Sequence, residues 1–278
     1  MSEDTVKGFD KLKLGDVMAS LDSEYNSLDG GYQNGATKRE RDYKIYAMKP
    51  MGQDIQGRSK TIDSTTFDKV EWLTPNLVRP FVESDEVIEV EPEDEGSYVA
   101  SQYMREILTY QLKRSQSWYD IVHSSVKGAL IWGQSYAKLH FEKRSGLPDI
   151  VRVEPVHPSE IRYDTDCDDF YKSSVVVHDV SVTASDLKEM VGKPGMNDEA
   201  IKELLSMRGN DYKYLNERGA EQRERENSRM YMGNGVSQFD EENKYFVLHE
   251  HYRNMDVDGS GVSIPVIATY AQGQLIKF

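Results

Sequence analysis

Residues 117–153 read SWYDIVHSSVKGALIWGQSYAKLHFEKRSGLPDIVRV, and the pattern of apolar residues changes once within this stretch. The Ser-x-x-Asp at its start resembles a capping box that opens a helix over residues 118–132, and Gly133 can end that helix in a left-handed conformation. Residues 136–142 then alternate as in a half-buried strand, and residues 150–153 provide a return strand. A helix followed by a β-hairpin predicts an α+β fold of mixed helices and antiparallel strands.

A second helix is predicted between Glu93 and Arg114, before this stretch. Acidic residues stand at its start and basic residues at its end, which matches the helix macrodipole. Its apolar stripe consists of residues spaced three and four apart: Val99, Tyr103, Ile107 and Tyr110. We expect the two helices to pack together as a hairpin.

The N-terminal part, residues 1–50, is predicted to be a helical region. Apolar residues between Phe9 and Leu28 recur at the spacing that places them on one helical face. The sequence Asp29-Gly30-Gly31 is expected to end this helix, and a second helical stretch follows before Pro50.

Residues 51–278 are assigned to one larger α+β domain. Two prolines within residues 64–82 predict short irregular or helical pieces there, and residues 87–90 are predicted to form a brief strand. Capping signals predict two short helices farther along, one after Thr183 and one after Asn197.

The last third of the chain contains a long polar segment followed by strands. Residues 210–244 are rich in Glu, Arg, Asn and Gly, and they are interpreted as an exposed excursion. Strands are predicted at residues 245–253 and 262–270, with a turn at Gln272-Gly273. Because the sequence still alternates at its last residue, we expect a truncated meander.

Composition limits the possible partners. The formal net charge of −14 opposes tight, sequence-independent binding to the phosphate backbone, but it is compatible with DNA that only slides past. The single cysteine, Cys167, cannot form an internal disulfide, which fits folding in a reducing cytoplasm. No apolar run reaches about eighteen residues, so neither a membrane span nor a signal peptide is expected.

Two histidines are the main candidates for metal binding. His249 and His251 are two residues apart, which on a strand points both side chains to one face. Asp164, Asp166 and Asp168 alternate like oxygen ligands of calcium, but the glycine and glutamate of an EF-hand loop are missing. A solvated acidic turn explains the aspartates, and no residue is assigned to a metal.

Motifs for catalysis are missing from the sequence. It contains neither a G-x-S-x-G nucleophile elbow nor a G-x-x-x-x-G-K-[ST] phosphate loop. Cys167 lies among aspartates, whose negative field suppresses thiolate formation. We therefore assign no catalytic and no cofactor-binding residue, and we expect that the protein is not an enzyme.

The basic and aromatic residues have structural explanations. Glutamate interrupts both basic runs, residues 38–41 and 223–225, so solvated helix faces explain them. Trp118 and Trp132 lie in the two helices that we expect to pair, and core packing is their predicted use.

Several short motifs, taken in order, resemble the portal proteins of P22-like tailed bacteriophages. The first three are GRS at 57–59, VEWLTPNL at 70–77 and DEVIEVEP at 85–92. The others are GQSYAK at 133–138, PVHPSEI at 155–161, VTASDL at 182–187, EHY at 250–252 and DVDG at 256–259. The resemblance extends from about Tyr43 to the end, and the order of the motifs carries it.

This resemblance implies a structural subunit of the phage portal ring, the head-to-tail connector through which double-stranded DNA is packaged and ejected. It implies a dodecamer at the portal vertex of the virion, assembled in the host cytoplasm, with residues 51–278 as a wing-type domain. The implied partners are terminase, scaffolding and coat proteins and tail adaptor proteins, with transient passage of DNA and no membrane. Stem, clip and crown elements are not identifiable, so no residue is assigned to the channel.

Two other interpretations stay open. The first is a metal-dependent enzyme or binding module that uses His249, His251 and the aspartates between Asp164 and Asp168. The second is another virion or tail-adaptor structural protein, which would share the acidic, cysteine-poor composition. Elemental analysis after gentle purification tests the first, and imaging of ring symmetry tests the second.

Overall fold

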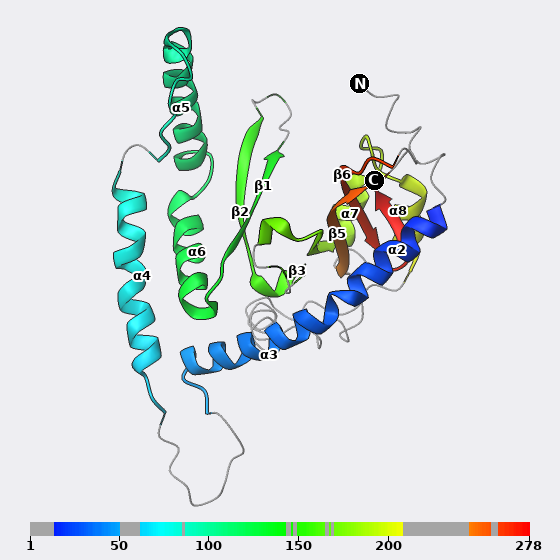
Figure 1. Cartoon of the computed structure of the whole chain (residues 1–278), viewed down its shortest axis with the longest axis horizontal. Coiled ribbons are helices and arrows are strands. Elements are labelled where there is room, and N and C mark those ends of the chain that lie inside the picture. The colour runs from blue at the N-terminus through cyan, green and yellow to red at the C-terminus, as the bar shows by residue number, and fades with distance from the viewer. Residues whose placement is uncertain are drawn as a thin grey trace, which may run out of the picture. The chain divides into compact units, whose positions relative to one another are not determined.

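The computed structural model describes residues 14–50, 62–84, 87–142, 146, 149–164, 167, 170–207, 245–256 and 261–278. The chain forms two compact units (Figure 1). Unit 1 consists of Met1–Glu40 and Ser159–Phe278, and unit 2 consists of Arg41–Pro158. Helices and antiparallel sheets occur in the same chain, which confirms the predicted α+β class.

Unit 1 contains a five-stranded antiparallel sheet in which neighbours in the chain are neighbours in the sheet. Its strands are β3 (Ile161–Tyr163), β4 (Val175–Thr183), β5 (Tyr245–Met255), β6 (Ile264–Ala271) and β7 (Gln274–Lys277). Gln272 and Gly273 connect the last two strands, and both have positive φ, as a type I′ turn requires. The strands and the turn predicted for this end of the chain are therefore confirmed.

Helices cover both faces of this sheet. On one face, α7 (Ala184–Met190) and α8 (Asp198–Ser206) pack against a core that includes Phe246 and Leu248. On the other face, α2 (Leu14–Ser27) places Val17 and Leu21 against a cluster of strand residues: Ala268, Tyr270 and Leu275. The alternation along the strands thus divides the buried side chains between two helical layers.

Capping residues set the starts of α7 and α8. Thr183 and Asp186 form a reciprocal capping box, and the Asn197 side chain accepts a hydrogen bond from the backbone N–H of Ala200. Both helix starts are confirmed. The excursion predicted for residues 210–244 lies outside the described residues.

The N-terminal helices follow each other almost without a break. Only Leu28 separates the end of α2 from α3 (Asp29–Tyr46), and the Tyr32 N–H donates to the Leu28 carbonyl. The predicted end of the first helix before Asp29 agrees with the end of α2 at Ser27, but Gly30 and Gly31 themselves lie inside α3 and form no turn. The boundary between the two units falls within this helix.

Unit 2 contains three helices, a short 3-10 turn and a β-hairpin among its described residues. They are α4 (Thr65–Glu83), η1 (Glu95–Ser97), α5 (Tyr98–Lys113), α6 (Trp118–Trp132), β1 (Tyr136–Glu142) and β2 (Ile150–Val156). Gly133 ends α6 with φ 74°, and the two strands pair in an antiparallel register. The helix end and the hairpin agree with the sequence-based predictions.

Helix α4 corrects the expectation of short pieces in residues 64–82. It is one helix of 19 residues that includes Pro75 and Pro80. Side chains next to Pro75 donate to carbonyls of the preceding turn, Thr74 Oγ1 to Val70 and Asn76 Nδ2 to Trp72. Because α4 also packs along α6, tertiary contacts outweigh the helix-breaking tendency of proline.

Two further predictions in unit 2 were wrong. Residues 87–90 form no strand, since a strand requires a partner that the local pattern does not reveal. The predicted hairpin of α5 with α6 is not formed: the two helices follow each other end to end, and α6 lies beside α4 (Figure 1). Helix pairing depends on distant residues, which periodicity alone does not identify.

The outer edge of β2 is covered by glutamine side chains instead of a third strand. Gln116 donates from Nε2 to the Val151 carbonyl at 2.9 Å and accepts from the Val153 N–H at 3.0 Å. Gln111 accepts from the Val151 N–H at 3.3 Å. These bonds attach the hairpin to the α5–α6 segment.

We expect Gln116→Leu to lower the free energy of unfolding by about 1–3 kcal/mol, because it leaves two backbone groups of β2 without their partner. Urea denaturation measures this change. Gln102→Leu, at an exposed position of α5, is the matched control and should change stability by less than about 0.5 kcal/mol. Equal stabilities of the two variants would contradict the role given to Gln116.

Candidate functional site

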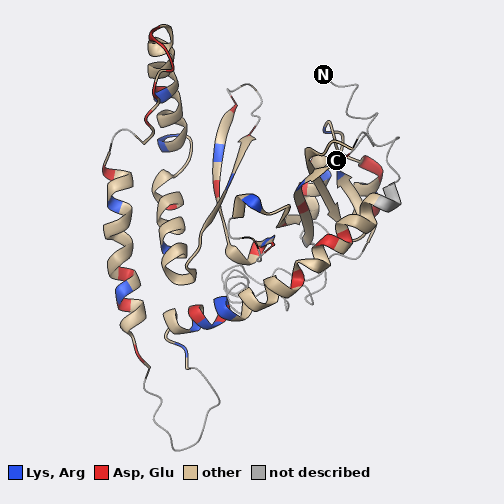
Figure 2. Ribbon diagram, viewed as in Figure 1, with Lys and Arg blue, Asp and Glu red and all other residues tan. Residues whose placement is uncertain are grey.

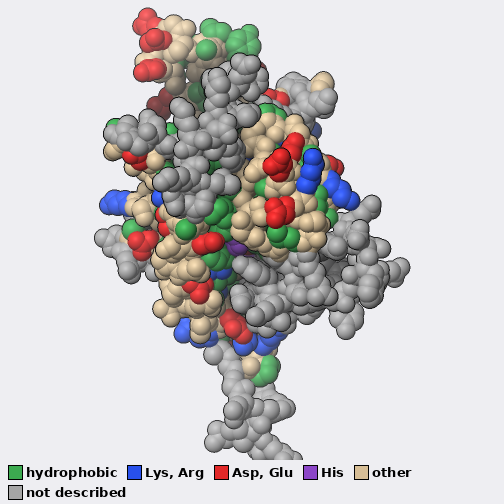
Figure 3. All heavy atoms as spheres, turned by 90° about the vertical axis from the view of Figure 1, so that its right-hand side faces the viewer, with side chains coloured by type: hydrophobic (Ala, Val, Ile, Leu, Met, Phe, Trp, Pro, Cys, Tyr) green, Lys and Arg blue, Asp and Glu red, His purple; other side chains and the backbone are tan. Residues whose placement is uncertain are grey.

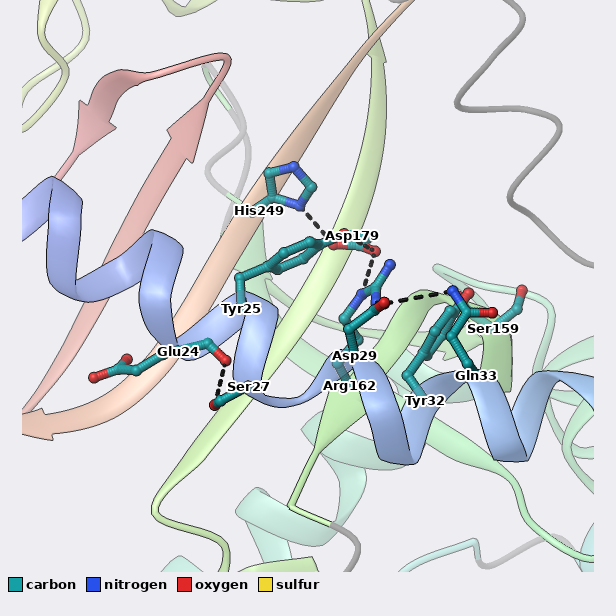
Figure 4. A network of polar contacts seen from close by, with 10 residues as sticks. All are labelled: Glu24, Tyr25, Ser27, Asp29, Tyr32, Gln33, Ser159, Arg162, Asp179 and His249. Carbon is teal, nitrogen blue, oxygen red and sulfur yellow. Dashed lines mark hydrogen bonds and ion pairs between the residues drawn. The ribbon is translucent and has the colours of Figure 1, made fainter.

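A buried ionic cluster lies on the face of the unit 1 sheet that α2 covers. It joins Arg162 on β3, Asp179 on β4 and His249 on β5, and each of these side chains is less than a tenth exposed. The strand register brings them together, because Asp179 lies directly opposite His249 and Arg162 lies opposite Val177, two residues from Asp179 on the same face. Figure 4 shows the cluster from close by.

Asp179 accepts hydrogen bonds from three elements. His249 Nδ1 is 2.7 Å from Asp179 Oδ1, and Arg162 Nε is 3.3 Å from Oδ2. The Tyr25 hydroxyl of α2 donates to the same Oδ2 at 3.4 Å. Burial acts to raise the pKa of Asp179, but the hydrogen bond from His249 and the charges of His249 and Arg162 outweigh it, so the pKa lies below its usual value.

Arg162 is also enclosed by the helices. Its guanidinium carbon lies 4.3 Å from the centre of the Tyr25 ring and 3.8 Å from that of Tyr32, in cation–π contacts. Its Nη1 is 2.8 Å from Asp29 Oδ1, at the start of α3. The Tyr32 hydroxyl donates to the Ser159 carbonyl at 2.9 Å. The cluster therefore fastens the α2–α3 junction to the sheet (Figure 4).

His251 lies on the same face of β5 but has a different environment. Its side chain is fully buried, and neither ring nitrogen has a hydrogen-bond partner within the described residues. Glu24 Oε2 of α2 is 3.9 Å from Nδ1. Burial, together with the charges of His249 and Arg253, lowers the pKa of His251 to about 4. The imidazole is therefore neutral near pH 7.

A second ion pair continues the attachment of α2. Arg253 on β5 forms a salt bridge with Glu24, and its Nη1 donates to the Ser20 hydroxyl at 3.1 Å. On the opposite face of the sheet, Tyr252 donates to Glu250 at 3.0 Å, and burial with the Glu250 charge raises the pKa of Tyr252. Charged side chains of β5 thus make polar contacts on both faces of the strand.

The geometry indicates a structural rather than a chemical use of the cluster. Both oxygens of Asp179 are occupied by groups of the protein, and Arg162 and His249 are enclosed between the sheet and the helices. A catalytic group has to contact its substrate, which such enclosure prevents. The arrangement holds two helices on a sheet.

The predicted metal-site candidates are not brought together. His249 and His251 do share one face of β5, as their spacing predicted, but His249 Nδ1 is bound to Asp179. Within the described ranges, no group of three or more His, Cys, Asp or Glu side chains could hold a metal ion. Asp164 contacts Cys167, with Oδ2 3.7 Å from Sγ, while Asp166 and Asp168 lie outside those ranges.

Sequence reasoning missed Arg162, Asp179 and the tyrosines that surround them. A usable signal exists for Asp179, since it stands in the Val-rich strand VVVHDVSVT, where an unpaired charge would be unfavourable. Its partner His249 is 70 residues away in the chain, and only the sheet register connects the two.

The tryptophans have separate environments. Trp132 is buried and its ring meets that of His157 edge to face, which agrees with the core prediction. Trp118 is only half-buried and donates from Nε1 to the Phe81 carbonyl at 3.0 Å. The Trp72 side chain on α4 is 67% exposed.

A smaller polar cluster in unit 2 connects the last residue of α3 with α4 and α6. The Tyr46 hydroxyl donates to Glu71 at 2.6 Å, and Lys127 lies 2.8 Å from the same carboxylate. The hydrogen bonds from Lys127 and Tyr46 lower the pKa of Glu71.

The basic run at residues 38–41 lies on α3, where acidic and basic residues alternate in Figure 2.

Comparison with known proteins gives a family match. Residues 17–146 and 143–278 match the model of the family described as Phage SU10 portal protein. No curated protein matches the chain. Among the helices of the described part, none is both long enough and apolar enough to cross a membrane.

Proposed function

Because the chain belongs to the phage SU10 portal protein family, we propose that it is a structural subunit of the portal ring, the head-to-tail connector through which double-stranded DNA is packaged and ejected. The observation that carries this proposal is the family match, which spans residues 17–146 and 143–278. The family is structural, and the proposed role requires no chemistry from the protein.

The charge balance supports passage of DNA without adhesion. A net charge of −14 repels phosphates on average, and tight nonspecific binding would need clustered Lys and Arg side chains that displace counterions. Basic segments are interspersed with acidic ones along the described helices (Figure 2). On the face of the molecule drawn in Figure 3, acidic, basic and hydrophobic side chains are likewise mixed.

The buried cluster supports a structural role. Arg162, Asp179 and their helical partners join residues that are more than a hundred positions apart in the chain. Such long-range contacts resist separation of α2 and α3 from the sheet, because separation would leave buried polar and charged groups without their partners. This property suits a subunit that stays folded in an assembly.

The proposed subunit number, location, partners and domains also follow from membership of the portal protein family. We propose a dodecameric ring at the portal vertex of the virion, assembled in the host cytoplasm. Terminase, scaffolding and coat proteins and tail adaptor proteins are the proposed partners. Residues 51–278 are proposed as a wing-type domain that follows a helical region, residues 1–50.

Negative-stain electron microscopy of the purified full chain tests the proposal. We expect annular particles of one symmetry, each with a central opening, because a ring subunit assembles through contacts between neighbours. Elemental analysis of the same sample should find no stoichiometric metal. A field of small, non-annular particles, or a metal bound at one equivalent per chain, would contradict the proposal.

A further inference from the structure

Helix α5 exposes its apolar stripe instead of burying it. Val99, Tyr103, Ile107 and Tyr110 recur on one face of the helix, and each is between 56% and 64% exposed. The opposite face is the one that unit 2 covers, with Ser101 and Leu112 buried. An apolar stripe of this kind normally faces a packed partner. Within the described part of unit 2, no element covers this face of α5.

The β1–β2 hairpin has a second exposed apolar face. Residues that lie directly opposite each other in an antiparallel pair point to the same side, and on one side every pair is apolar: Ala137 with Pro155, Leu139 with Val153, and Phe141 with Val151. Leu139 is 68% exposed and Phe141 is 78% exposed. The polar residues of the hairpin, including the Arg152–Glu142 ion pair, lie on the other side.

The exposed area of the α5 stripe is large enough to form part of an interface. Each of its four side chains is more than half exposed. At roughly 100 Å² for each such side chain, the stripe presents roughly 400 Å², about half of the roughly 800 Å² that one partner contributes to a standard protein interface. Single exposed apolar residues are normal on a protein surface, but contiguous patches of this size mark contact sites.

The symmetry of a closed ring restricts which surface of the next copy can contact the α5 stripe. A two-fold dimer can use one patch twice, whereas a ring of more than two copies needs two different patches on every copy, one for each neighbour. Unit 2 presents two such patches on different elements, the α5 stripe and the hairpin face. Both are apolar, so their contact would also avoid the repulsion expected between copies that each carry a net charge of −14.

We propose that the α5 stripe of one copy packs against the hairpin face of the next copy, as the head-to-tail contact of the ring. This proposal rests on the proposed function, because it takes the ring as given and assigns its contact. The α5 side contributes Tyr103 and Ile107 at its centre, and the hairpin side contributes Leu139 and Phe141. Tyr is among the residue types that most often dominate binding energy at interfaces, so Tyr103 is expected to contribute most.

Charge insertion tests the α5 side. Tyr103→Glu combined with Ile107→Glu should abolish annular particles and leave monomers, with the melting temperature of the dissociated chain unchanged, because both side chains are exposed in the single copy. Tyr171→Glu is the matched control, since Tyr171 is 91% exposed on η3 (Phe170–Lys172) of unit 1. Its rings should persist. Rings of normal yield from the Tyr103/Ile107 variant would overturn the proposal.

Crosslinking tests the pairing of the two faces. In a Cys167→Ser background, a chain with both Tyr103→Cys and Phe141→Cys should give a ladder of covalent oligomers with a short bis-maleimide, because each copy then joins two neighbours. Either cysteine alone should give no crosslinked product. Dimers from Tyr103→Cys alone, or intact rings without a ladder from the double-cysteine chain, would overturn the head-to-tail pairing.

The unmodified chain distinguishes failure of the proposed function from failure of the assigned contact. If it forms no rings, the proposed portal function fails, whatever the variants do. If it forms rings and the α5 variant forms them equally well, only the assigned contact fails.

Discussion

Replacing Asp179 with asparagine is expected to lower the free energy of unfolding by about 3–5 kcal/mol. The carboxylate is buried and receives hydrogen bonds from His249, Arg162 and Tyr25, so its removal leaves the Arg162 guanidinium buried without its main counter-charge. Guanidinium chloride denaturation of the purified variant beside the unmodified chain measures the loss.

The control for this variant is Asp22→Asn. Asp22 is exposed on α2, so the same chemical change there should shift stability by less than about 0.5 kcal/mol. A loss below about 1 kcal/mol for Asp179→Asn would mean that the cluster contributes little to holding α2 and α3 on the sheet.

Stability is also expected to fall by about 3 kcal/mol as the pH is lowered from 7 to 4, because of His251. Its folded-state pKa of about 4 lies below the ordinary value of 6.5. Between these two values the unfolded chain binds a proton at this residue and the folded chain does not, so acidification favours unfolding. The contribution is fully present above about pH 6.5 and is lost as the pH approaches 4.

Denaturation curves recorded at several pH values measure this effect, and His251→Phe should remove it. His123→Gln, a substitution of a half-buried histidine on α6, is the control that should retain it. Asp179 affects the free energy of unfolding in a different pH range from His251. Its pKa is lowered, so its contribution is present above about pH 4 and disappears only at lower pH. If His251→Phe shows the same slope between pH 7 and 4 as the unmodified chain, the assignment to His251 is wrong.

Local signals predicted much of the fold. The capping box at Thr183, the left-handed Gly133 and the two-residue turn at Gln272-Gly273 each depend on a few neighbouring residues, and each is formed as expected. The strand pairs around those turns are confirmed for the same reason. The hairpin of β1 and β2 fixes its own register through a short connection.

Features that depend on distant contacts could not be predicted in this way. The prolines of α4 indicated a break, but packing against α6 and the side-chain bonds of Thr74 and Asn76 keep the helix continuous. The stripe on α5 was correctly identified as apolar, yet its periodicity carries no information on whether the covering partner lies in the same copy. Periodicity likewise could not indicate that α6 packs against α4 and not against α5.

In the candidate site, too, local spacing could be predicted and contacts between distant residues could not. Period-two spacing correctly placed His249 and His251 on one face of a strand. Whether such a pair binds a metal or an aspartate depends on the neighbouring strand, which supplies Asp179. Arg162 enters from a third strand, and the tyrosines enter from helices at the other end of the sequence. A cluster assembled from so many segments leaves no compact motif.

We propose that this chain works as a subunit of a closed ring, through contacts between neighbouring copies. Native mass spectrometry of the full chain, over a range of protein concentrations, measures how many copies assemble. We expect one dominant species whose mass is a fixed multiple of the chain mass and does not change as the concentration rises. A mixture of monomers and dimers at every concentration would contradict it.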